Sequence, residues 1–242
     1  MQTEIAARLT SLNRQFYQTF ALQFSATRQR LQPGVQRVLE HLPFTAHLLD
    51  LGCGNGELAR ELLRRQHKGS YLGLDFSREL LAYANGVLGE ATTTRFHFQQ
   101  ADLTIAGWEQ ALQGFQPHIV LAFAVLHHIP GVEQRRDILR TVNRLLPADG
   151  QFVFSVWQFL NSPRLTKRIQ PWEAIGINAA DVEDGDYLLD WRQGGHGLRY
   201  VHHFNQAELL ALAGETGFKV SETFLADGEK GKLGLYQLWT LC

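Results

Sequence analysis

A short glycine-rich segment after an apolar run constrains the fold of this chain most strongly. Residues 47–51 read His-Leu-Leu-Asp-Leu, and glycines follow at positions 52, 54 and 56. The apolar run predicts a buried strand, and residues 57–66 predict the helix after it. Because glycine adopts backbone conformations that other residues avoid, the segment predicts a sharp turn at which a ligand can approach bare backbone. A strand, turn and helix of this kind are typical of alternating α/β proteins.

The spacing of the glycines indicates the kind of ligand. Dinucleotide-binding turns use Gly-x-Gly-x-x-Gly and place a pyrophosphate at a helix N-terminus. Here Gly52, Gly54 and Gly56 alternate, and Asp50 stands two residues ahead of them. A carboxylate at this place repels an anion and attracts a cation. S-adenosylmethionine carries an ammonium and a sulfonium and no phosphate, so the segment favours it over a dinucleotide. A tight turn without a ligand is the plain structural alternative.

The segment resembles the glycine-rich motif of class I S-adenosylmethionine-dependent methyltransferases. The resemblance implies an α/β fold, a Rossmann-like sandwich with helices on both faces of a seven-stranded, mostly parallel sheet that ends in an antiparallel hairpin. It also implies S-adenosyl-L-methionine as the cofactor. The residues expected around this cofactor are Tyr17, Arg28, Asp50, Gly52, Gly54, Asn55, Gly56, Asp75, Phe76, Asp102, Leu103 and Ala122.

The rest of the chain alternates apolar runs with segments of helical spacing, as a mostly parallel sheet requires. Apolar residues between Ser11 and Leu42 predict two helices, separated at Pro33-Gly34. The later elements are strands at 70–75, 95–99, 118–123, 151–157, 219–224 and 233–240, and helices at 78–88, 132–146 and 205–216. The pattern lapses between Trp157 and Leu198, which predicts an irregular insert.

These elements predict a single methyltransferase domain over residues 1–242. Its expected parts are an N-terminal helical lid at 1–42, a cofactor-binding core at 43–157, a substrate insert at 158–197, and a C-terminal helix and hairpin at 198–242.

Two acids follow predicted strands at the edge where open α/β sheets bind ligands. Asp75 ends the second strand and Asp102 follows the third. By family resemblance, Asp75 accepts hydrogen bonds from the ribose hydroxyls while Phe76 lies against the adenine. Asp102 accepts from the adenine amino group, and the Leu103 backbone contributes beside it. Either acid alone is equally read as a helix cap or a solvated loop residue.

Two adjacent histidines follow the fourth predicted strand. His127 and His128 lie in the segment Ala122-Phe-Ala-Val-Leu-His-His-Ile-Pro130, which faces the reacting methyl group in this fold. We expect one of them, assigned as His127, to point into the pocket and the other to pack or to meet backbone. A purely structural role for both is the alternative.

Further motifs narrow the resemblance. Ser25-Ala-Thr-Arg28, Ala124-Val-Leu-His-His128, Glu133-Gln-Arg-Arg136, Asp186-Tyr-Leu-Leu-Asp-Trp191 and Gly197-Leu-Arg-Tyr-Val-His-His-Phe204 recur in order. Together they resemble the wobble-uridine tRNA methyltransferases, which esterify a carboxymethyl group on uridine in the anticodon loop. The resemblance places Arg28 in the lid over the cofactor, with Tyr17 beside it, and families of this kind often need a small activating protein subunit.

That reaction explains an apparent shortage of catalytic bases. A carboxylate is ionised at neutral pH, so the enzyme must orient it with a positive group and need not deprotonate it. Arg199 and His202 are candidates for binding and orienting the substrate carboxylate, and Tyr200 is a candidate for stacking or hydrogen bonding. In a strand, Tyr200 and His202 share one face and Arg199 the other, so only one face can line the pocket directly. An edge strand with solvated polar residues is the alternative.

Composition leaves the acceptor open. The formal net charge is −1, whereas RNA-binding proteins usually present a basic surface. Local basic clusters are Arg135, Arg136, Arg140 and Arg144 on one predicted helix, and Arg164, Lys167 and Arg168 in the insert. The alternatives to tRNA are a small-molecule O-, N- or C-methyltransferase and a cofactor-binding subunit without catalysis. Two cysteines, no secretory signal pattern and no membrane-length apolar run predict a cytoplasmic protein without membrane contact, and we expect no metal site.

Overall fold

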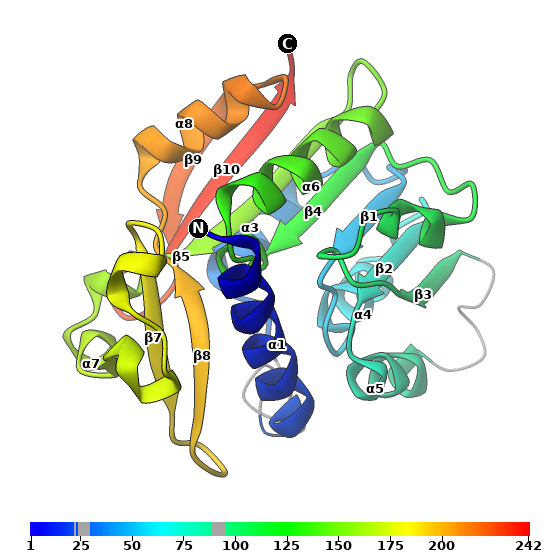
Figure 1. Cartoon of the computed structure of the whole chain (residues 1–242). Coiled ribbons are helices and arrows are strands. Elements are labelled where there is room, and N and C mark those ends of the chain that lie inside the picture. Colours follow the sequence, from blue (N-terminus) through cyan, green and yellow to red (C-terminus); the bar gives the residue numbers. More distant parts are fainter. Residues whose placement is uncertain (22, 24–29, 89–94) are drawn as a thin grey trace.

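The computed structural model describes residues 1–21, 23, 30–88 and 95–242 (Figure 1). Its core is a seven-stranded sheet in the order β3-β2-β1-β4-β5-β10-β9. The first five of these are mutually parallel, and β10 runs antiparallel to both β5 and β9. The strands are β1 (Leu48–Leu51), β2 (Tyr71–Asp75), β3 (Phe96–Gln100), β4 (Ile119–Phe123), β5 (Gln151–Trp157), β9 (Phe218–Ala226) and β10 (Gly234–Leu241). The Rossmann-like sheet with a terminal hairpin, as predicted, is confirmed.

Helices cover both faces of this sheet. On one face, α6 (Val132–Leu145) and α8 (Gln206–Glu215) bury apolar residues such as Leu139 and Leu212 against the strands. On the other face lie α3 (Pro33–His41) and α4 (Glu57–Arg64), which bury Val38 and Leu62. The crossover helix α5 (Arg78–Leu88) follows β2. Because successive strand residues point to opposite faces, β1 supplies Leu48 to one core and Leu49 to the other.

The segment predicted to be an irregular insert folds into a second sheet, so that prediction is wrong. Strands β6 (Ile169–Gln170), β7 (Asp186–Trp191) and β8 (Gly197–His202) are antiparallel and lie beside the main sheet (Figure 1). Almost every residue of β7 is buried. A strand covered on both faces shows no apolar-polar alternation, which is why the sequence pattern did not reveal it. The helix α7 (Pro163–Thr166) and the 3-10 turns η4 (Phe159–Asn161), η5 (Trp172–Ile175) and η6 (Ala179–Asp181) complete the insert.

The N-terminal helix α1 (Thr3–Thr19) begins eight residues before the predicted start at Ser11. It packs against β8, and Asn13 joins the two elements: its side chain accepts a hydrogen bond from Tyr200 N (2.8 Å) and donates to Tyr200 O (3.1 Å). Two further 3-10 turns, η2 (Trp108–Leu112) and η3 (Leu126–His128), lie in the core. Within the described ranges, no helix is both long and apolar enough to cross a membrane.

Candidate active site

Two adjoining cavities lie at the carboxyl ends of the core strands. The larger, here called the central cavity, has a volume of about 340 Å³ and is lined by Asp50, His127 and Arg199 among others. The smaller, the lid cavity, measures about 150 Å³ and lies under α1, with Tyr17 and Asp75 in its wall. Both are bordered by Gly52, Gly54, Leu80, Phe123, Ala124 and His128. Both cavities therefore lie at the predicted edge of the sheet, and the glycine turn separates the central cavity from the lid cavity.

The glycines of this turn differ in what surrounds them. A Cβ atom on Gly54 (φ +55°) would meet no atom within 4 Å, because this residue faces the open cavities. A Cβ atom on Gly56 (φ +75°) would lie 2.8 Å from Ala84 Cβ, so this glycine permits the packing of α4 against α5. Gly56 lines neither cavity, and Asn55 lines the central one. The bare backbone at Gly54 is a cradle that fits a closely bound ligand.

Asp50 lies at the base of the central cavity and is only 3% exposed. Burial raises the pKa of its carboxyl to about 7, partly offset by the Tyr71 hydroxyl, which donates a hydrogen bond at 2.6 Å; the nearby Asp75 charge raises the pKa further. A cation bound beside Asp50 therefore stabilises the ionised carboxylate. The carboxylate of Asp50 in the cavity wall therefore fits a positively charged ligand.

The two acids after β2 and β3 both line the lid cavity. Asp75 accepts hydrogen bonds from Gly54 N and Ser77 N, each at 2.9 Å, and burial raises its pKa. The carboxylate thus fixes the glycine turn while facing the cavity. Asp102 pairs with Arg14 of α1 and accepts from Thr104 N (2.9 Å). Sequence reasoning named both acids, but it did not anticipate the Arg14 partner from the lid helix.

The remaining cofactor candidates are placed as follows. Phe76 and Leu103 line the lid cavity, and the Phe76 ring meets that of Tyr17 edge-on at 6.2 Å. Ala122 is fully buried and lines neither cavity, whereas Ala124 lines both. Ala124 has φ +59°, a strained conformation for a residue with a side chain, and such strain is frequent at functional sites. Arg28 lies outside the described residues.

Both adjacent histidines line the central cavity, so the expectation that only one would face it is wrong. They lie in the 3-10 turn η3, and their rings are in contact with centroids 4.2 Å apart. His127 Nδ1 accepts the Trp157 N–H at 3.2 Å. His128 lies between the cavities, with Nε2 2.7 Å from the Tyr17 hydroxyl. His128 therefore connects the lid helix to the cavity wall.

Arg199 of β8 points its guanidinium toward the central cavity although the residue is only 6% exposed. Its Cζ atom lies 4.9 Å from the ring centroid of Trp157 and 5.5 Å from that of Trp191. Its Nε atom has no hydrogen-bond partner among the described residues. A buried cation held by aromatic rings, with a donor unused, is suited to bind an anion.

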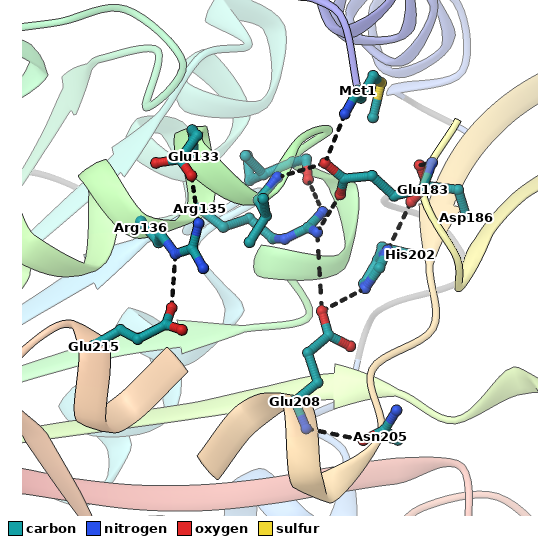
Figure 2. Close-up of polar contacts among 12 residues, drawn as sticks. Met1, Glu133, Arg135, Arg136, Glu183, Asp186, His202, Asn205, Glu208 and Glu215 are labelled. Carbon is teal, nitrogen blue, oxygen red and sulfur yellow. Dashed lines mark hydrogen bonds and ion pairs between the residues drawn. The ribbon is translucent and has the colours of Figure 1, made fainter. Parts of the chain in front are cut away.

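Tyr200 and His202 lie on the opposite face of β8 and line none of the cavities described here. The Tyr200 hydroxyl donates a hydrogen bond to Asp186 Oδ1 at 2.6 Å. His202 belongs to a buried polar network that joins the second sheet to α6 and α8 (Figure 2). His202 Nδ1 lies 2.6 Å from Asp186 Oδ1, and its Nε2 lies 2.8 Å from Glu208 Oε1. Burial lowers the pKa of His202, but the two carboxylates outweigh it, so the net shift is upward. One face of β8 lines the central cavity, and that face carries Arg199.

Three of the four arginines of α6 pair with carboxylates, and the fourth, Arg144, donates a hydrogen bond to Thr141 Oγ1 at 2.8 Å. Arg135 is buried and pairs with Glu183 at 2.7 Å, inside the network of Figure 2. Arg136 contacts Glu215 at 2.7 Å and Arg140 contacts Asp137 at 3.3 Å. Their charges are therefore largely neutralised within the fold.

Comparison with known proteins agrees with this geometry. The methyltransferase domain family matches residues 24–223. This chain belongs to that family. It is an enzyme that uses S-adenosylmethionine as its cofactor. Among solved structures, the 1,6-didemethyltoxoflavin N1-methyltransferase of Burkholderia thailandensis, with bound 1,6-didemethyltoxoflavin and S-adenosylhomocysteine, has the same fold. Its TM-score is 0.65 at 18% identity, covering 98% of this chain and 89% of that one.

Curated relatives act on different acceptors. A protein of Encephalitozoon cuniculi, named as a methyltransferase without an acceptor, is 28% identical over 85% of this chain and 86% of its own length. The tRNA (carboxymethyluridine(34)-5-O)-methyltransferase of Arabidopsis thaliana is 25% identical over 58% of this chain and 31% of its own length. The trans-aconitate 2-methyltransferase of Acidovorax ebreus is 34% identical over 43% of this chain and 36% of its own. The family is thus established, while the relatives differ in substrate.

Proposed function

We propose that this methyltransferase transfers a methyl group to a carboxylate oxygen, and that the carboxylate is the carboxymethyl group of a modified uridine in tRNA. The observation that carries the proposal is Arg199: a buried guanidinium with an unused Nε donor beside the central cavity. When bound, the cofactor supplies an electrophilic methyl group on a positively charged sulfur. A carboxylate needs no base before it attacks, so orientation by Arg199 and exclusion of water are the protein's main contributions.

We assign the cofactor to the two cavities together. Its adenosine half fits the lid cavity, where Asp75 takes the ribose hydroxyls, Phe76 lies against the adenine, and Asp102 with Leu103 meets the adenine edge. Its methionine half fits the central cavity, with the ammonium near Asp50. The bare backbone at Gly54, where a Cβ atom would meet nothing, supports this close approach.

His127 has a supporting role in this proposal. Because its Nδ1 accepts the Trp157 N–H, the neutral ring carries its proton on Nε2. Since Nδ1 is occupied by this hydrogen bond, we assign His127 no role as a general base. The interior position of Tyr200 and His202 supports a structural role for both, in place of the substrate contacts that the sequence suggested.

The relatives support a carboxylate acceptor from two directions, because carboxymethyluridine and trans-aconitate both carry carboxylates. The tRNA assignment rests on the ordered motifs that end in Arg199-Tyr200-Val201-His202. A small carboxylic acid is the second candidate. The ion pairs of Arg135, Arg136 and Arg140 favour it, because they weaken one of the two basic clusters available for phosphate contacts.

Transfer of radiolabelled methyl from S-adenosylmethionine tests the proposal. We expect incorporation into tRNA from a strain that lacks this gene, and little into tRNA from the parent strain, in which the site is already esterified. Nucleoside mass spectrometry should show carboxymethyluridine converted to its methyl ester. If trans-aconitate becomes labelled and tRNA does not, the acceptor is the small carboxylic acid. If neither becomes labelled, the carboxylate assignment is overturned.

A further inference from the structure

A third cavity of about 210 Å³ lies between β5 and the second sheet. We call it the insert cavity. It shares Trp157, Arg199 and Leu233 with the central cavity, so the two spaces meet at the buried guanidinium. Arg164 and Arg168 also line it. Arg164 is exposed, Arg168 is half-buried and Arg199 is buried, so the three cations form a series from solvent toward the reaction centre.

The local fold brings these arginines together. Arg164 lies in the short helix α7 and Arg168 lies two residues beyond its end, and both line the insert cavity. Leu165 between them is buried and anchors the turn. The backbone carbonyl of Arg168 accepts the Asp190 N–H at 3.0 Å, which ties this arginine to β7.

The charges in the insert cavity are not balanced by the protein. Within the part of the chain that the structure describes, neither Arg164 nor Arg168 nor Arg199 lies within ion-pair distance of a carboxylate, unlike the arginines of α6. The single acid in the cavity wall, Asp190, is paired through Oδ2 with Arg192 at 2.6 Å, while its buried Oδ1 has no hydrogen-bond partner among the described residues. Three unpaired cations gathered around one hollow repel each other unless an anion binds there.

We infer that the insert cavity binds a second anionic group of the acceptor, held by Arg164 and Arg168 while Arg199 orients the carboxylate that is methylated. The acceptor is then a molecule with two negative groups, and the flat rings of Trp157 and Trp191 cover the part between them. A nucleotide phosphate and a second carboxylate share this chemistry. The inference deepens the proposed function and rests on it for the role of Arg199.

The most direct test compares two acceptors that differ by one phosphate: 5-carboxymethyluridine and its 5′-monophosphate. With the native enzyme we expect the monophosphate to have a KM about tenfold lower at similar kcat. In the double variant Arg164→Gln/Arg168→Gln we expect this advantage to disappear, because the KM for the monophosphate rises to that for the nucleoside. Lys167→Gln is the matched control, because this exposed lysine lies between the two arginines and lines none of the three cavities.

Two further measurements identify the source of the anion. If it is RNA phosphate, the double variant weakens binding of deletion-strain tRNA and reduces the slope of log affinity against log salt by about 2. If it is a second carboxylate, the double variant raises the KM for trans-aconitate about tenfold and leaves the salt slope for tRNA unchanged. If the native enzyme and the double variant have the same KM values, the same tRNA affinity and the same salt slope, the inference is overturned.

A binding measurement separates this inference from the proposed function. Calorimetry of inorganic phosphate and of citrate, with S-adenosylhomocysteine present, reports on the insert cavity without any turnover. We expect binding by the native enzyme and by Lys167→Gln, and about tenfold weaker binding by the double variant. If no carboxylate is ever methylated but this difference persists, the proposed function fails and the anion site stands. If the native enzyme and the double variant bind these anions equally, the insert cavity is not an anion site.

Discussion

Replacing Arg199 with methionine should separate activity from stability. Methionine keeps an unbranched apolar stem but lacks the guanidinium, whose Cζ atom lies against the rings of Trp157 and Trp191. No carboxylate among the described residues depends on this cation, so its removal leaves no buried partner unpaired. Cation-π contacts of about 0.5–2 kcal/mol are lost, and the cost of burying the charge is lost with them. We expect the free energy of unfolding to change by no more than about 1 kcal/mol.

The effect on catalysis should be much larger. A hydrogen bond between charged groups contributes about 1.5–3 kcal/mol, so kcat/KM should fall roughly 10- to 150-fold. The kcat/KM of Arg199→Lys should lie between that of the native enzyme and that of Arg199→Met, because lysine keeps the positive charge but not the planar guanidinium. Lys167→Met is the control, since Lys167 is exposed, has no ion pair with another described residue and lines none of the three cavities.

The assay is methyl transfer to deletion-strain tRNA, with thermal unfolding and calorimetry of S-adenosylhomocysteine measured on the same preparations. The reasoning holds if Arg199→Met loses turnover at near-native stability and cofactor affinity. Native kcat/KM in this variant, or a loss of stability that accounts for the lost turnover, would refute it.

Three other outcomes follow from the geometry. Because the folded pKa of Asp50 is raised to about 7, affinity for the cationic cofactor should increase as pH rises through 7, and calorimetry of Asp50→Asn should show this dependence removed. Gly54→Ala should weaken cofactor binding about tenfold or more with a stability cost near 1–2 kcal/mol, whereas Gly56→Ala, whose Cβ meets Ala84, should mainly lower the melting temperature. The pKa of His202 is raised in the folded state, so its contribution to stability is complete below about pH 6.5 and is lost as pH rises through the higher folded value. Unfolding measured from pH 6 to 9 should show this loss in the native protein and not in His202→Gln, and the same slope in both would contradict the assignment.

The strands and the glycine turn could be predicted from the sequence because their signals are local. The apolar run before Asp50 and the alternate glycines each require a particular backbone, and the structure has φ of +72°, +55° and +75° at Gly52, Gly54 and Gly56. The carboxyl-edge acids followed from the topology of a parallel sheet, which fixes where strand ends meet.

The second sheet could not be predicted, because its central strand β7 is buried on both faces and the pairing of the strands is not local. β6 meets β7 through Ile169 and Leu189, residues separated by a long loop with no strand pattern of its own. The side of β8 that faces the cavity also depends on this pairing, so the sequence could name Arg199, Tyr200 and His202 without choosing among them. The Arg14 partner of Asp102 was missed for the same reason, since it comes from a helix distant in sequence.

The chemical nature of the transferred methyl tests the central claim most directly. After transfer of radiolabelled methyl to deletion-strain tRNA, mild alkali hydrolyses a methyl ester and releases volatile labelled methanol. Methyl groups on nitrogen, carbon or ether oxygen stay on the tRNA under the same treatment. We expect nearly all of the label to be released as methanol. Label that remains on the nucleoside would contradict carboxylate methylation and the role given to Arg199.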